Sequence, residues 1–154
     1  MEEEEEEELT IAARPTAWFN KWNELHRDND LPAVIHENNK QEWFKNGLRH
    51  RDGDLPAVIY PSGTQEWWKN DYLHRENDLP AIIKADGSKE WWKYDCLHRD
   101  DPDLPAVINA DGTKEWYFEC EKVSTEERDN ARKNMAVALY KHTPLPEDMI
   151  HEVV

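Results

Sequence analysis

The sequence has few of the features that mark membrane, secreted or nucleic-acid-binding proteins. Its 154 residues hold no apolar run near the roughly 18 residues that a membrane-spanning helix needs. Lysine and arginine number 19 against 34 acidic residues, so the formal net charge is −15, and the chain stays acidic without the run Glu2–Glu8. This balance opposes binding to nucleic acid or anionic lipid, because such affinity comes from cations that neutralise phosphate. The acidic N-terminus lacks the basic and apolar regions of a secretory signal, so we expect an intracellular, cytoplasmic protein.

Cysteine and glycine are scarce, and each shortage excludes a class of site. Cys96 and Cys120 lie 24 residues apart, which is one period of the repeat described next. Two strands of a sheet would separate their Cα atoms by about 9–10 Å, whereas a disulfide tolerates at most about 7 Å. We therefore expect two free thiols in a reducing compartment. The five glycines form no phosphate-binding loop, and the sequence has neither a GxSxG nor a CxxC motif.

What the sequence does contain is a repeat of 24 residues. Each unit has a His-Arg pair, an Asp-Leu-Pro-Ala segment, and a Glu-Trp pair followed by a second aromatic residue. The last Asp-Leu-Pro-Ala copy is displaced by one extra residue near Pro102. Self-similarity at a fixed period is typical of an array in which every unit packs on its neighbours. The His-Arg pairs begin at His26, His50, His74 and His98.

Turn residues divide each unit into short β-strands. Asn46-Gly47 lies between two β-prone segments, and Asn-Gly is typical of a type I′ hairpin turn. Ser-Gly or Asp-Gly follows β-branched runs such as residues 57–60 and marks the other turn. The sequence thus predicts an all-β repeat array, an antiparallel meander of about nine strands with one β-hairpin per 24-residue unit and a C-terminal α-helical cap.

Counting outward from the turns predicts which residues face each other. Around Asn70-Asp71, Trp68 faces Leu73, Trp67 faces His74 and Glu66 faces Arg75. The other turn places Val58, Ile82 and Val107 opposite Trp67, Trp91 and Trp116. We interpret the recurring glutamates and arginines as cross-strand ion pairs, and each histidine as a ring stacked on the facing tryptophan. This structural set comprises Glu42, Arg51, Glu66, Arg75, Glu90, Arg99, His50, His74 and His98.

Two aromatic rows are the candidate interaction surface. Eight tryptophans are many for a chain this polar. Three possibilities remain open: the sheet curls and buries a row itself, a second copy or a partner protein covers it, or it is an open platform for a ligand such as a sugar ring. One row is Trp43, Trp67, Trp91 and Trp116, and the second, expected on the opposite face, is Phe44, Trp68, Trp92 and Tyr117.

The recurring polar residues indicate neither catalysis nor a metal site. The histidines recur one unit apart, about 9.5 Å along a sheet, far beyond the reach of shared metal ligation at about 2 Å. Paired carboxylates such as Asp100-Asp101 act as acid and base only in a water-poor cleft, and nothing in the pattern predicts one. We therefore expect a protein that is not an enzyme and has no metal or cofactor.

The flanks of the array differ from it in composition. Residues 1–16 form an acidic head that we expect to be disordered, because seven consecutive glutamates repel one another. Residues 17–118 form the array, and residues 119–154 a helical C-terminal cap. Ser124 and Glu127 match a capping box, and the following segment has acids early, bases late and an apolar stripe. A helix of about four turns should therefore cover the last strand, which would otherwise be an open edge.

The units resemble MORN repeats, which are aromatic-rich β-hairpins with Asn-Gly and Asp-Gly turns. The matching text is EWFKNGLRHRDGDLPAVIYPSGTQ, residues 42–65, and the resemblance covers about 100 of the 154 residues. Where MORN units usually carry Gly-x-Gly after the histidine, this chain has Asp-Leu-Pro-Ala. Such LHRxxxxPAVI variants are similar to repeats of large DNA viruses and some bacteria, which implies a host cytoplasm or a virion as the location. MORN proteins mostly serve as scaffolds, and some have been proposed to touch phospholipid.

The leading functional hypothesis is a non-catalytic repeat scaffold that mediates protein–protein interaction or self-assembly through its aromatic faces. Its partner would be another protein or a second copy in a homodimer, while binding to nucleic acid, a membrane or a small ligand is not expected. The alternative is a platform for carbohydrate or a lipid headgroup on an exposed tryptophan row. Residues 144–154, PLPEDMIHEVV, resemble the opening of an F-box, which leaves a second short capping helix or an adaptor remnant open there.

Overall fold

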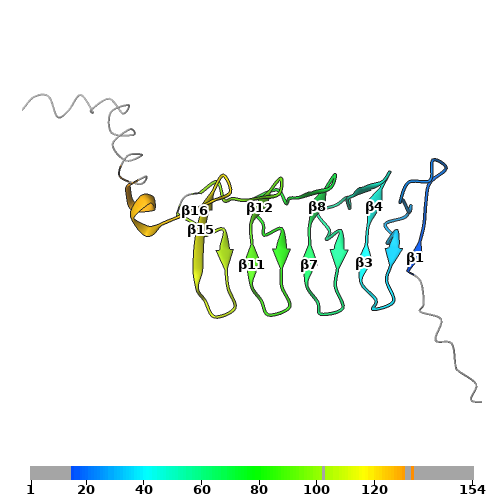
Figure 1. The fold of residues 1–154 in the computed structure, drawn as a ribbon, viewed down its shortest axis with the longest axis horizontal. Helices are drawn as coiled ribbons and strands as arrows, with labels where there is room; N and C mark the ends of the chain where they lie inside the picture. Colours follow the sequence, from blue (N-terminus) through cyan, green and yellow to red (C-terminus); the bar gives the residue numbers. More distant parts are fainter. Residues whose placement is uncertain (1–14, 102, 131–132, 134–154) are drawn as a thin grey trace, which may run out of the picture.

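The computed structural model describes residues 15–101, 103–130 and 133, which form the predicted all-β array with a short C-terminal helix (Figure 1). Ten antiparallel strands form one sheet in the order β1-β2-β3-β6-β7-β10-β11-β14-β15-β16. The units stand side by side, with β1 at one end and the helix at the other. The sheet strands are β1 (Thr16–Ala17), β2 (Val34–Ile35), β3 (Gln41–Glu42), β6 (Val58–Ile59), β7 (Gln65–Glu66), β10 (Ile82–Ile83), β11 (Lys89–Glu90), β14 (Val107–Ile108), β15 (Lys114–Phe118) and β16 (Glu121–Val123).

Three two-stranded hairpins lie along one edge of this sheet (Figure 1). We number the units by their hairpins: unit 1 carries β4–β5, unit 2 β8–β9, unit 3 β12–β13, and unit 4 the end of β15 with β16. The hairpin strands are β4 (Phe44–Lys45), β5 (Leu48–Arg49), β8 (Trp68–Lys69), β9 (Tyr72–Leu73), β12 (Trp92–Lys93) and β13 (Cys96–Leu97).

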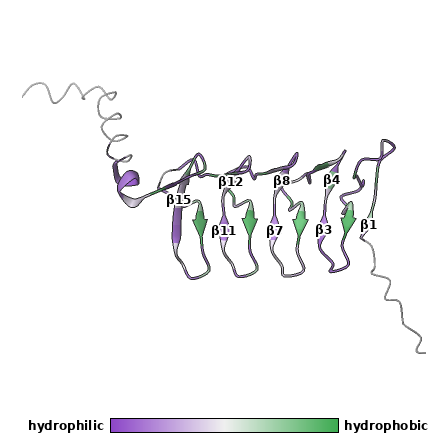
Figure 2. Cartoon of the chain, viewed as in Figure 1, coloured by the Kyte–Doolittle hydropathy of each residue, from purple (hydrophilic) through white to green (hydrophobic). Residues whose placement is uncertain are grey.

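Within the sheet, apolar and polar strands alternate along the array. Figure 2 shows the green Val/Ile strands lying between the purple β3, β7 and β11. Between β6 and β7, the Tyr60 N–H donates to the Thr64 carbonyl at 2.9 Å, which leaves a three-residue loop, 61–63, in which the Gly63 N–H donates to the Tyr60 carbonyl at 2.9 Å. Gly63 has φ of 92°, a left-handed conformation that glycine adopts without a Cβ penalty.

This loop shifts the pairing register by one residue from the predicted one. Val58 pairs with Glu66, and not with Trp67. The same correction applies to Ile82 and Val107, which pair with Glu90 and Glu115. The loop glycine forms a bulge and so adds one residue to the connection, which the count from a two-residue turn leaves out.

The hairpin turns are the predicted type I′ turns. Asn46 and Gly47 have φ of 50° and 82°, the left-handed pair that this turn requires. Trp68 pairs with Leu73 as predicted, and the His74 N–H donates to the Trp67 carbonyl at 3.1 Å. Glu66, the residue before Trp67, belongs to strand β7 of the main sheet. The hairpin pairing therefore ends at Trp67 and His74 and does not include Glu66 and Arg75.

Successive hairpins overlap, and each turn hydrogen-bonds to the second strand of the preceding hairpin. The Asp71 N–H donates to the Arg49 carbonyl at 3.0 Å, and the Asp95 N–H to the Leu73 carbonyl at 3.1 Å. The carboxylate of the same aspartate binds the preceding hairpin a second time: Asp95 Oδ1 accepts the Leu73 N–H at 2.6 Å.

The overlap overturns the prediction of free thiols. Cys96 and Cys120 form a disulfide with a Cα separation of 4.9 Å. The extra residue near Pro102 aligns Cys120 with Asp95 of unit 3, so the two cysteines are not equivalent positions one unit apart. Cys120 occupies the turn position whose aspartate reaches the preceding hairpin in units 2 and 3. Overlapping hairpins bring these positions closer together than the two strand spacings, about 9.5 Å, from which free thiols were predicted.

The core is a thin line of small and aromatic residues between the sheet and the hairpins. The alanines of the four Asp-Leu-Pro-Ala segments are fully buried, and the Trp67 N–H donates to the Ala81 carbonyl at 2.8 Å. Trp67, Leu73 and Ala81 form one buried cluster. The alanine methyl group is thus enclosed where the hairpin joins the sheet.

The C-terminal helix begins at the predicted capping box. The Ser124 N–H donates to Glu127 Oε2 at 2.8 Å, and the Glu127 N–H donates to Ser124 Oγ at 3.2 Å. Residues 125–130 and residue 133 are helical. The predictions for the glutamate run, for the later turns of the helix and for residues 144–154 lie outside the described residues.

Candidate interaction surface

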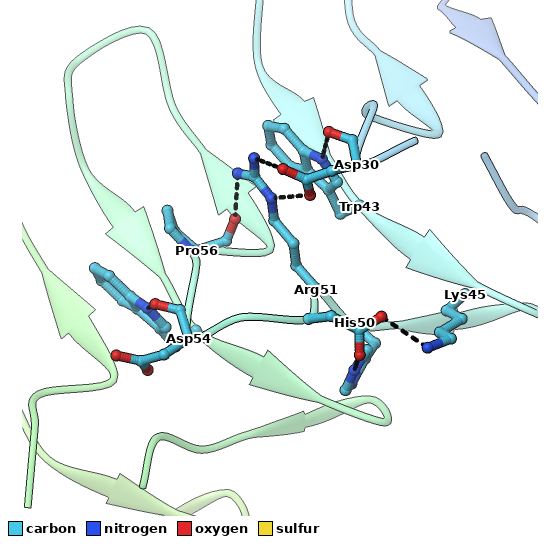
Figure 3. A network of polar contacts seen from close by, with 9 residues as sticks. Asp30, Trp43, Lys45, His50, Arg51, Asp54 and Pro56 are labelled. Carbon is cyan, nitrogen blue, oxygen red and sulfur yellow. Dashed lines mark hydrogen bonds and ion pairs between the residues drawn. The ribbon is translucent and has the colours of Figure 1, made fainter. Parts of the chain in front are cut away.

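The His-Arg and Glu-Trp motifs meet in a bonded network between neighbouring units. The Arg51 guanidinium lies over the Trp43 ring, 3.9 Å from its centroid (Figure 3). Arg51 Nε and Nη2 both donate to the Asp30 carboxylate at 2.7 Å, and Nη1 donates to the Pro56 carbonyl at 3.2 Å. Trp43 Nε1 donates to the Asp30 carbonyl at 3.1 Å. One aspartate thus holds both the tryptophan and the arginine that follow it in the chain.

The same network recurs along the array and corrects the predicted Glu–Arg pairs. Arg75 binds Asp54 at 2.8 Å, and Arg99 binds Asp78 at 2.7 Å. The predicted pairs of Glu42 with Arg51, Glu66 with Arg75 and Glu90 with Arg99 are therefore wrong, because the arginine extends over its tryptophan toward the preceding unit. The stacked pairs are Arg27 on Trp18, Arg51 on Trp43, Arg75 on Trp67, Arg99 on Trp91 and Arg128 on Trp116.

The first tryptophan row is consequently core. Trp43, Trp67 and Trp91 are 6%, 6% and 7% exposed, so none of them offers a surface to a partner. Trp116 of unit 4 keeps part of its surface open. For the first three members, the array itself provides the burial that the sequence left undecided.

The second aromatic row, Phe44, Trp68, Trp92 and Tyr117, is half-buried and holds a row of glutamates. Trp68 Nε1 donates to Glu66 Oε2 at 2.8 Å, while the Tyr60 hydroxyl donates to Glu66 Oε1 at 3.0 Å. Trp92 Nε1 binds Glu90 in the same way at 2.8 Å. The Tyr117 hydroxyl donates to Glu115 Oε2 at 3.2 Å, so the indole and phenol groups of this row bond within the array.

In unit 1 the side chain of Phe44 has no hydrogen-bond donor, and an arginine donates to the glutamate instead. Arg49 stands where units 2 and 3 have leucine, and it donates through Nη2 to Glu42 Oε2 at 2.8 Å. Burial alone would raise the pKa of Glu42, but hydrogen bonds from Lys40, Arg49 and His36 outweigh it and lower this pKa to about 2.

The histidines form a third bonded set, on the hairpins. His50 Nε2 lies 3.0 Å from Asp52, which also accepts a bond from Lys45 at 2.7 Å. The predicted stacking on the facing tryptophan is wrong for the two histidines that contact another ring, because an arginine covers each of those tryptophans. His74 stacks on Tyr94 at 4.2 Å, and His98 contacts Phe118 at 5.0 Å. Among the described residues, no group of three or more His, Cys, Asp or Glu could hold a metal ion.

The large exposed apolar residues lie outside both predicted aromatic rows. The leucine of every Asp-Leu-Pro-Ala segment is exposed: Leu31 by 43%, Leu55 by 41%, Leu79 by 38% and Leu104 by 37%. We call these four the leucine row. The signal was present in the sequence, since an apolar residue recurs in a loop of polar neighbours. Large apolar side chains are also exposed on the hairpins at Leu48, Tyr72, Tyr94 and Phe118.

Grooves separate the loops that carry the leucine row. Leu55 and Leu79 line two of them, of about 240 and 130 Å³, between successive units. The groove between unit 4 and the helix is larger, about 490 Å³, and its lining includes Leu104, Trp116, Phe118 and Val123. We call it the terminal pocket.

The comparisons with known proteins give no family. No family model, curated protein or solved structure matches the chain. In the part of the chain that is described, no helix is long and apolar enough to cross a bilayer. The observations define a largely β-sheet protein with many short antiparallel strands.

Proposed function

We propose that this protein is a non-catalytic scaffold of MORN-like units that binds a protein partner along the leucine row. The proposal rests on one observation. In the central units the recurring arginines, glutamates, tryptophans and histidines contact neighbours within the array, while the recurring leucine is more than a third exposed. Single exposed leucines are ordinary, but a row at unit spacing offers a regular apolar surface.

The polar chemistry of the array supports a scaffold over an enzyme. A catalytic group needs a proton or electron pair that its environment leaves free to react. Arg75 donates to Asp54 and to the Pro80 carbonyl, and Glu66 accepts bonds from Tyr60 and Trp68. These side chains serve the contacts between units, so their recurrence has a structural cause.

The test compares the full chain with its Leu55→Asp/Leu79→Asp variant by proximity labelling in cells that express the protein. Both side chains face solvent, so we expect melting temperatures within about 1–2 °C, and a set of labelled proteins at least tenfold depleted with the variant. Identical sets of labelled proteins for the full chain and the variant would refute the proposal that the leucine row binds a partner. Light scattering on both proteins shows whether the lost partner is a second copy of the chain.

A further inference from the structure

We propose that the terminal pocket is a docking site for one apolar side chain carried by a basic segment of a partner protein. This inference rests on the scaffold function and names a specific place on it. Unit 4 departs from the repeat at the positions that form this pocket. In a scaffold whose other units are nearly identical, such departures mark the place where specificity can be built.

The first departure replaces an ion pair beside the groove with an aromatic ring. In units 1 to 3 a lysine before the hairpin turn reaches an acid in the following loop: Lys45 to Asp52 at 2.7 Å, Lys69 to Glu76 at 2.5 Å and Lys93 to Asp100 at 2.7 Å. Phe118 holds the lysine position in unit 4, and Thr125 holds the position of the acid. The ion pair is absent there, and an aromatic ring that is 49% exposed takes its place.

The second departure supplies the far wall. The His-Arg loop that would follow unit 4 is replaced by Val123 and the start of the helix. Arg128 of that helix lies 4.4 Å from the centroid of the Trp116 ring, as Arg99 lies over Trp91 in unit 3. The helix thus continues the stacking of the array but leaves the groove open. The terminal pocket has a mainly apolar lining and a volume of about 490 Å³, enough for a large side chain.

The charges around the pocket select a cationic partner. Its basic residues are already engaged: Arg99 binds Asp78, Lys122 binds Glu115, and Arg128 lies over Trp116. In the described part of the chain, the lining carboxylates of Asp101, Glu121 and Glu127 have no lysine or arginine partner. An apolar pocket with an unneutralised acidic rim complements a segment in which Lys or Arg flanks one large apolar residue.

The same charges disfavour the chain's own C-terminal segment as the occupant. Residues 134–154 contain Lys141 against three acids, Glu147, Asp148 and Glu152, so this segment is itself acidic. A second copy of the chain, which carries a net charge of −15, is repelled as well. A basic partner is the occupant that the rim attracts.

The experiment selects twelve-residue peptides from a random phage-displayed library against the full chain, with counter-selection against Phe118→Lys. This variant restores the residue of units 1 to 3, and its melting temperature checks its fold. We expect enriched peptides in which Lys or Arg flanks one Leu, Met, Phe or Trp. The consensus peptide should bind Phe118→Lys at least tenfold more weakly than the parent chain, and Glu121→Lys several-fold more weakly. Its affinity for Phe19→Lys, a variant at the opposite end of the array, should be unchanged. Affinity should fall as salt rises.

Four results would overturn the proposal for the terminal pocket. The first is a selection that yields no enriched peptide, or only acidic ones. The second is binding that Phe118→Lys leaves unchanged. The third is a photo-cross-link from benzoylphenylalanine at position 118 to residues 134–154 or to a second copy. A cellular partner that is lost with Leu55→Asp/Leu79→Asp and kept with Phe118→Lys would refute the pocket alone and leave the scaffold function standing.

Discussion

At the residue scale, the arginine of each unit has the largest number of roles. Arg75 covers Trp67 at 3.9 Å, bonds Asp54 through two nitrogens, and donates to the Pro80 carbonyl at 3.2 Å. Its planar fork matches a carboxylate in a way that an ammonium group cannot. A positive charge alone therefore does not explain why arginine recurs at this position.

The first prediction separates charge from geometry at Arg75. Arg75→Lys keeps the charge but loses the two-nitrogen bond, so we expect it to cost about 1 kcal/mol, and Arg75→Ala about 1–2 kcal/mol. The control is Lys69→Ala, which removes an exposed ion pair and should leave the free energy of unfolding nearly unchanged. Urea unfolding measures all three, and a lysine variant as stable as the parent chain would contradict the geometric role.

The second prediction concerns acid. The pKa of Glu42 is about 2 in the folded chain, below its ordinary value of 4.5, so the unfolded chain takes up the proton first as pH falls. The stabilisation from ionised Glu42 is complete above about pH 5 and is lost progressively toward pH 2. Glu42→Gln should therefore lower stability at pH 7 and flatten its decline between pH 5 and pH 2.

Thermal unfolding across this pH range measures the effect of Glu42→Gln. Glu37→Gln, at an exposed neighbouring position, is the charge-matched control. Parallel curves for Glu42→Gln and the parent chain would show that the carboxylate contributes no pH-dependent stability.

At the scale of the element, the overlapping hairpins connect the units a second time, outside the sheet. In units 2 and 3 an aspartate in the turn makes this connection, with Asp71 Oδ1 accepting the Arg49 N–H at 2.7 Å. In unit 4 the Cys96–Cys120 disulfide makes it covalently. The disulfide thus fastens the last hairpin, which has a neighbouring unit on one side only.

The third prediction follows from this equivalence. Removing the disulfide with Cys96→Ser/Cys120→Ser should cost about 3.5 kcal/mol, the chain-entropy value for a loop of about 25 residues. Cys96→Ser/Cys120→Asp should recover about 0.5–1.5 kcal/mol, because the carboxylate can accept the Leu97 N–H as Asp95 accepts that of Leu73. Urea unfolding of both variants is the measurement. Equal stability of the two would show that the turn aspartate does not connect the hairpins.

At the scale of the whole molecule, each unit bonds chiefly to its neighbours. Arg99 of unit 3 reaches Asp78, and the Ala85 N–H donates to Thr64 Oγ1 of the preceding loop at 3.1 Å. Stability in such arrays is approximately a sum of units and of the interfaces between them. One unit can therefore be removed if the new junction repeats the old one.

The fourth prediction is that deletion of residues 55–78 gives a shorter folded array. It joins Asp54 to Leu79, which recreates the Asp-Leu-Pro-Ala segment in phase. We expect retained near-ultraviolet circular dichroism of the stacked tryptophans and a lower melting temperature. Deletion of residues 55–66 removes half a unit, breaks the phase and should unfold the chain. A half-unit deletion that folds as well as the full-unit deletion would contradict the nearest-neighbour architecture.

The sequence by itself determined the period, the fold class and the hairpin turns. These features depend on local chemistry: Asn46-Gly47 favours left-handed backbone, and β-branched runs favour strands. The capping box of Ser124 and Glu127 is local for the same reason, since its two bonds span three residues. The array is equally evident from the amino-acid sequence, because four near-identical units follow one another at a nearly constant spacing.

Only the tertiary structure decided which partners the recurring side chains choose. A bulge at Gly63 shifts the pairing of Val58 from Trp67 to Glu66. The chain leaves the hairpin at Trp67, and Arg75 extends over Trp67 to Asp54 of the preceding loop and not to Glu66. The overlap of the hairpins likewise brings Cys96 within disulfide distance of Cys120. These contacts join residues more than 20 positions apart, and their geometry depends on how one unit rests on the next, which a count along the chain does not contain.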